Sequence, residues 1–315
     1  MPSPATIALW VVTTWIGSAL AATLLRSVRP NWISTIGFSL LPVVATAVGT
    51  VAFRGWPHFP PREDVDRLML IGLPFVVIVC VITAGSRPRS WWVRAAAVAA
   101  MVRLVLHGSS YVSPTGGDRA WSFFEQSGHL VVWSAVATVA WWLSDQEVRN
   151  HPAVNTGYRL ALATLASGVV AVISGYISVG LGLVVLGAAA LGWAWGRGVG
   201  RPGTPGDAVE SAHWLLWVAL LAAASYFADL PLWAAWGLLA VPALSWLTFL
   251  VQSTRTARWR PVASYVIFVF GTAVLVAGVF WHHLLHNNSS PASSGQPTIQ
   301  DYMSFPGDGV PIRRP

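Results

Sequence analysis

The sequence predicts an all-α protein, a polytopic integral membrane helix bundle with about ten transmembrane helices. Hydrophobic residues make up 55% of the 315 residues and charged residues 10%, whereas a soluble domain carries about 25% charged residues. Apolar runs of about 18 to 22 residues recur along the chain, and this length matches the hydrocarbon core of a bilayer. Such runs are expected to be helices, because backbone polar groups in lipid must be paired within their own segment.

The apolar segments occupy most of the chain up to residue 286. We place them at 5–25, 32–53, 67–84, 91–111, 121–143, 159–175, 178–195, 211–228, 230–251 and 261–285. The stretch from 159 to 195 is too long for one straight span at a rise of about 1.5 Å per residue, and only residues 175–178 are expected to form a turn in it. The chain therefore divides into a transmembrane domain at 1–286 and a disordered polar tail at 287–315, which is rich in Ser, Pro, Gly and Asn.

The positions of the positive charges predict the orientation of the bundle. The sequence has nineteen Arg and no Lys, and twelve of the Arg fall in alternate gaps between the apolar segments. These twelve are Arg26, Arg29, Arg87, Arg89, Arg94, Arg149, Arg159, Arg197, Arg201, Arg255, Arg258 and Arg260. Because positively charged loops stay on the cytoplasmic side, the pattern places both the N-terminus and the C-terminus outside. Arg103 is the one Arg that we assign to neither a loop, nor an interface, nor the tail.

The protein is rich in tryptophan, with nineteen residues, most of them near predicted segment ends. Indole rings favour the membrane–water interface, so we interpret most of them as belts that contact the lipid bilayer. Trp133 and Trp246 lie deeper, and His213 is expected at the interface. The expected location is the plasma (inner) membrane. Whether the protein also binds other membrane proteins or forms a homo-oligomer stays open.

The best candidate site begins on segment 91–111. Arg103, His107 and Tyr111 are spaced at i, i+4 and i+8, so a continuous helix would present all three on one face. An arginine inside a membrane segment is costly to leave facing lipid, so this face is expected to point into the bundle. In segment 121–143, Glu125 and His129 are likewise four residues apart and enter from the same outer side.

Two interpretations of these five residues stay open. In the first, they line an outward-facing polar pocket, in which Arg103 binds an anionic group while the histidines and Glu125 relay protons or hold a ligand. In the second, Arg103 and Glu125 form an ion-paired lock between two helices and bind no ligand.

A second cluster of polar residues lies at the end of the last apolar segment. His282 and His286 share a helix face at i and i+4, a spacing at which two imidazoles chelate a divalent metal or serve as haem ligands. Two ligands do not complete a site, so a further ligand would have to come from elsewhere on the outer side. The alternative is a solvated helix end, and the sequence requires no cofactor.

No motif in the sequence names a substrate or a reaction. Phosphate-binding loops, dinucleotide-binding glycines, zinc-protease motifs and nucleophile elbows are absent from it, so an enzyme is the less favoured class, and a nucleic-acid partner has no support. The leading hypothesis is a small-solute permease or carrier with an outward-facing polar pocket around Arg103. The alternatives are a non-catalytic subunit or scaffold of a larger membrane complex, and a redox subunit with a His-ligated metal or haem.

Overall fold

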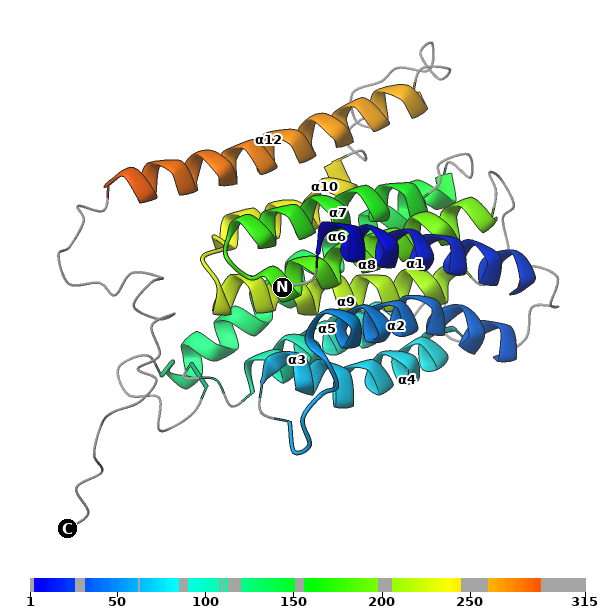
Figure 1. Cartoon of the computed structure of the whole chain (residues 1–315), viewed down its shortest axis with the longest axis horizontal. Helices are drawn as coiled ribbons and strands as arrows, with labels where there is room; N and C mark the ends of the chain where they lie inside the picture. The colour runs from blue at the N-terminus through cyan, green and yellow to red at the C-terminus, as the bar shows by residue number, and fades with distance from the viewer. Residues whose placement is uncertain are drawn as a thin grey trace.

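The computed structural model describes residues 3–25, 32–61, 63–84, 90–107, 109, 111–112, 120–150, 156–197, 206–244 and 260–289. Over these residues the protein is all-helical and has no strand, which confirms the all-α part of the prediction. Most of the helices pack side by side along the long dimension of the molecule (Figure 1).

The helices follow the predicted apolar segments. Their bounds are α1 Pro4–Leu25, α2 Trp32–Arg54, α3 Asp64–Arg67, α4 Leu73–Ala84, α5 Ser90–Leu106, α6 Phe123–Asn150, α7 Thr156–Ile173, α8 Ile177–Arg197, α9 Gly206–Phe227, α10 Leu232–Leu244 and α12 Arg260–Ser289. A π-helical turn, η1 (Leu68–Gly72), joins α3 to α4 without a break, so the described residues form ten helical rods, one for each predicted segment. The rod α12 continues to Ser289, past the predicted boundary at residue 286, and residues 290–315 of the predicted tail lie outside the described residues.

Several of these helices are suited to a membrane. Within the described residues, five stretches are long and apolar enough to cross one: Pro4–Leu25, Ile36–Arg54, Asp64–Thr83, Ile177–Gly196 and Ala263–Leu285. Large apolar side chains such as Leu20 on α1 and Phe270 on α12 are exposed on the outside of the bundle. Extended apolar surfaces of this kind are rare on soluble monomers, and they support an integral membrane protein. The count of ten crossings and the placement of the termini stay predictions.

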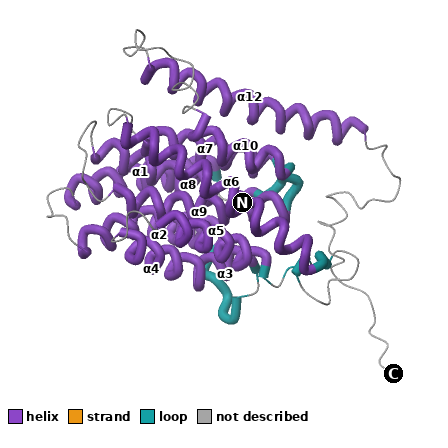
Figure 2. Tube along the Cα trace, turned by 180° about the vertical axis from the view of Figure 1, so that it is seen from behind, coloured by secondary structure: helices purple, strands orange, loops and turns teal. Residues whose placement is uncertain are grey.

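Helix α9 is the centre of the bundle. Every side chain from Val209 to Ala224 is buried, because α9 packs against α2, α4, α5 and α8. A helix that is apolar on nearly all sides belongs in such a position, and α9 buries only a few polar residues, among them His213. By contrast, α12 lies along the edge of the bundle, where it contacts α10 and α7 (Figures 1 and 2).

Two helices occupy the stretch from residue 159 to residue 195, as predicted. The helices α7 and α8 form an antiparallel hairpin whose turn places Gly175 at a φ of +91°, a conformation that glycine adopts without the strain of a side chain. The two backbones come close together, because a Cβ on Gly168 would lie 2.8 Å from the carbonyl oxygen of Gly180. Small residues permit such close contacts between membrane helices.

Candidate functional site

The predicted site residues of α5 do not share one helix face. Helix α5 ends at Leu106, so His107 lies in the following turn, where it is exposed, and Tyr111 lies beyond the helix. The prediction of a continuous helix from 91 to 111 is therefore wrong at its end. Arg103 lies in the last turn of α5, and its NH1 atom is buried without a hydrogen-bond partner among the described residues.

Glu125 serves a local role at the start of α6. Its Oε2 accepts a hydrogen bond from the backbone N–H of Ser122 at 2.8 Å, while its own N–H donates to the Ser122 hydroxyl at 3.3 Å. This reciprocal pair is a capping box, which satisfies backbone donors at a helix N-terminus. Glu125 is exposed, and within the described part of the chain it forms no ion pair with Arg103. The predicted lock between these two residues does not form here.

His129 does lie in a network of buried groups. The indole Nε1 of Trp133, one turn further along α6, donates to the Tyr226 hydroxyl oxygen at 2.8 Å, and this hydroxyl lies 3.1 Å from His129 Nδ1. Since an indole N–H can only donate, the Tyr226 oxygen accepts from Trp133 and its own proton is left free to point to His129, where the direction of the bond depends on the histidine tautomer. We infer that neutral His129 accepts at Nδ1 and carries its proton on Nε2.

Aromatic rings connect His129 to Tyr111. The Trp121 ring stacks on the His129 imidazole with centroids 4.3 Å apart, and the Tyr111 ring lies 4.9 Å from Trp121. The Trp121 backbone N–H also donates to the Tyr111 carbonyl at 2.8 Å. We call Tyr111, Trp121, His129, Trp133 and Tyr226 the outer aromatic cluster. The structure thus brings together two predicted site residues, Tyr111 and His129.

The sequence analysis missed two members of this cluster. Trp121 begins the apolar segment 121–143, a position that predicts an interfacial belt, and Tyr226 belongs to a helix distant in the sequence. No local pattern links Tyr226 to His129, which lie 97 residues apart. The depth of Trp133 was the one signal that pointed to this region.

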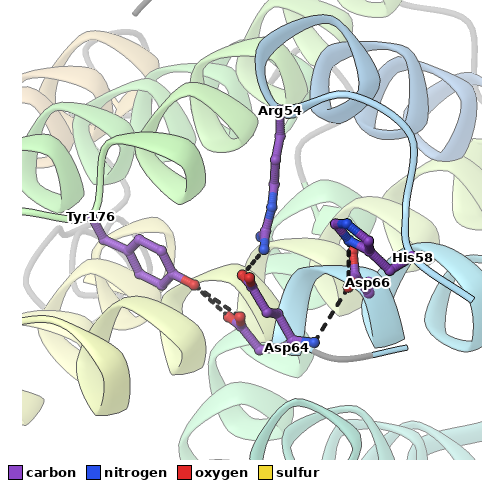
Figure 3. Close-up of polar contacts among 6 residues, drawn as sticks. Arg54, His58, Asp64, Asp66 and Tyr176 are labelled. Carbon is purple, nitrogen blue, oxygen red and sulfur yellow. Dashed lines mark hydrogen bonds and ion pairs between the residues drawn. The ribbon is translucent and has the colours of Figure 1, made fainter. Parts of the chain in front are cut away.

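A polar cluster surrounds the loop between α2 and α3 (Figure 3). Arg54 pairs with Glu63, the Tyr176 hydroxyl donates to Asp64 at 2.8 Å, and His58 Nδ1 lies 3.5 Å from Asp66 Oδ2. Asp64 and Asp66 are buried. Burial and the neighbouring Asp64 carboxylate raise the pKa of Tyr176, so this phenol remains a donor at neutral pH. The cluster holds α3 against the start of α8.

His213 lies inside the bundle and not at an interface, contrary to the sequence prediction. It is 1% exposed, because α9 is enclosed by other helices, and its Nε2 lies 2.7 Å from the hydroxyl of Thr164 on α7. The Thr164 hydroxyl donates its proton to the Leu160 carbonyl at 2.6 Å. His213 therefore donates through Nε2. One turn further along α9, Trp217 donates to Ser167 at 3.0 Å.

The histidines at the end of α12 do not form a metal site within the described residues. The His282 ring packs edge-on against Trp233, and His283 Nε2 lies 3.3 Å from the Ser174 hydroxyl. The side chain of His286 lies outside the described residues. Among the described side chains, no group of three or more His, Cys, Asp or Glu is arranged to hold a metal ion.

No protein-family model matches the chain, and no curated protein or solved structure matches it.

Proposed function

We propose that the protein is a small-solute permease with ten membrane-crossing helices, both termini on the outer side, and a binding site for an anionic solute. The site would lie where the end of α5, the start of α6 and the end of α9 meet, around Arg103 and the outer aromatic cluster.

The observation that carries this proposal is the position of His129. Tyr226 fixes the imidazole through Nδ1, and the Trp121 ring covers one of its faces. None of the hydrogen bonds among the described residues uses Nε2, so this N–H is available to a solute. An ionisable residue in a membrane segment is costly, and such residues commonly mark a pathway for substrates or protons.

Arg103 indicates the charge of the solute. Its NH1 atom is buried without a partner among the described residues, and an unsatisfied buried donor of a charged group is costly. An anionic solute, such as a small carboxylate, would satisfy this donor and accept from His129.

Helix α9 supports transport over simple binding. It carries His213 in one half and Tyr226 near its outer end, and the two residues bond to α7 and α6 respectively. Polar groups along one central helix suit a pathway whose two halves open in turn.

The first test is solute-dependent thermal unfolding of the purified protein, followed by uptake into vesicles. A small carboxylate that binds should stabilise the wild type, by about 2.7 kcal/mol at a concentration of 100 Kd. We expect Arg103→Gln to abolish both this stabilisation and uptake, while the unfolding temperature without solute changes little. Glu125→Gln is the matched control, because Glu125 bonds only to Ser122, and it should retain binding.

Two results would contradict the proposal. One is that no small anion stabilises the wild type. The other is that Arg103→Gln lowers the unfolding temperature without solute and leaves any solute effect unchanged, since Arg103 would then act as a structural residue only.

A further inference from the structure

The three helices that form the proposed solute site also meet at their opposite ends. Arg94, near the start of α5, pairs with Asp145, near the end of α6, and both side chains are mostly buried. Arg103 lies at the other end of α5, and His129 lies at the other end of α6. The ion pair therefore joins the two helices at the end that is remote from the solute site.

Indole rings close this end between α6 and α9. The Arg94 guanidinium lies 4.2 Å from the centroid of the Trp141 ring, and Trp141 stacks on Trp214 of α9 with centroids 6.1 Å apart. Trp217, on the next turn of α9, lies 5.1 Å from Trp214. All three indoles are at most 1% exposed, so this end of the helices is closed to water. We call Arg94, Trp141, Asp145 and Trp214 the inner plug.

The outer ends of the same three helices are more accessible. Trp121 and His129 are partly exposed, and His107, which follows the end of α5, is exposed. A carrier that works by alternating access exposes its site to one side of the membrane at a time, and closes the other side. An accessible outer end above a closed inner end is the form expected of its outward-facing state.

We propose that the inner plug is the inner gate of the permease, an inference that rests on the proposed function. A solute leaves on the inner side when Arg94 separates from Asp145 and the two indoles part. An ion pair suits such a gate, because the attraction between buried charges is largely offset by the hydration that they give up. Water that enters the opening gate restores this hydration, so the separation has a small net cost.

Cys80 provides a reporter for the gate. It is the single cysteine of the chain, it is 0% exposed on α4, and Arg94 lies close enough to act electrostatically on its thiol. An open gate would admit water and a small reagent to this thiol. The rate at which Cys80 reacts with a membrane-permeant maleimide therefore measures how often the gate opens, and the measurement requires no solute.

The first variant weakens the gate without changing its shape. Asp145→Asn should raise the rate of Cys80 labelling about tenfold or more, the effect of losing one hydrogen bond between charged groups. Glu125→Gln is the matched control, because it removes a negative charge at the outer end of the same helix, where Glu125 bonds only to Ser122. The control should label at the rate of the wild type.

The second variant separates a gate from a structural pair. Because the charge of Arg94 itself acts on the thiol, Arg94→Leu is combined with Asp145→Leu, which removes both charges. A gate without its ion pair should still open more often, so Cys80 should label faster than in the wild type even where stability is recovered. A pair that only stabilises the fold predicts that labelling slows again as stability returns.

Three results would overturn the proposal: wild-type labelling in Asp145→Asn, a return to the wild-type rate in the double variant, or an equal increase in Glu125→Gln. The labelling rates are measured without solute, so a failure of the gate appears in them. A failure of the permease appears instead in the solute-dependent unfolding of the wild type.

Discussion

At the residue scale, some arginines that set the predicted orientation also join helices. Arg94 pairs with Asp145 on α6 and its guanidinium lies 4.2 Å from the centroid of the Trp141 ring. Arg159 on α7 is 2% exposed and donates to Ser264 on α12. Arg94 and Arg159 therefore also lie within the bundle. The prediction that Arg103 is the one Arg inside it is wrong. Long side chains let a residue near a helix end reach a partner on a neighbouring helix.

The pair of Arg94 and Asp145 gives a prediction about stability. Both side chains are mostly buried, so Asp145→Leu leaves an uncompensated charge and should cost about 3 to 5 kcal/mol of unfolding free energy. Adding Arg94→Leu should recover much of this loss, because no isolated charge then remains. Chemical unfolding in micelles measures both effects, and a double variant less stable than Asp145→Leu alone would contradict the prediction.

At the scale of the elements, glycines decide how close two helices come. Helix α1 packs mainly against α8, where a Cβ on Gly192 would lie 2.2 Å from the carbonyl oxygen of Trp15, and one on Gly196 would lie 2.5 Å from that of Ala19. The obstructing atoms belong to the backbone of α1, so they cannot rotate away as a side chain can. Ala188, one turn before Gly192, is also small and buried. Small residues at this four-residue spacing permit close contact between membrane helices.

Gly192→Ala should therefore push α1 away from α8. Overpacking of this kind costs about 1 to 3 kcal/mol, which should lower the midpoint of unfolding and increase hydrogen exchange in α1. Gly17→Ala, on α1, is the matched control, because a Cβ on Gly17 would have no other atom within 4 Å. Equal effects of the two substitutions would show that close packing at Gly192 is not required.

At the scale of the whole molecule, successive rods alternate in direction. In Figure 1, α1 runs from the middle of the bundle towards the right and α12 runs towards the left, and the end of α1 and the start of α2 both lie at the right. This arrangement would gather the gaps that contain the twelve arginines on one side of a membrane, as the positive-inside rule requires. It supports the proposed orientation.

Cysteine labelling on intact cells tests this orientation. The single native cysteine, Cys80, is buried, so the wild type should not react with a membrane-impermeant maleimide. Trp56→Cys, in the exposed loop between α2 and α3, should react from outside, whereas Thr204→Cys, between α8 and α9 in the sequence, should react only after the membrane is permeabilised. The reverse pattern would invert the predicted topology.

The sequence by itself determined which segments form helices and that several of these helices are suited to a membrane. Each apolar run specifies its own helix, because its length, its lack of charge and its turn residues act locally, as Gly175 shows between α7 and α8. The ends were less well determined: α5 stops at Leu106, so Tyr111 lies outside it. Local pattern does not fix where a helix frays into a turn.

Only the tertiary structure decided which polar side chains meet. Tyr226 reaches His129, Asp145 reaches Arg94, and Glu125 bonds to Ser122 instead of Arg103. These outcomes depend on how each helix is rotated and which helix it packs against. In a chain whose segments are apolar on nearly every side, periodicity does not specify rotation, and the packing of the whole bundle sets it.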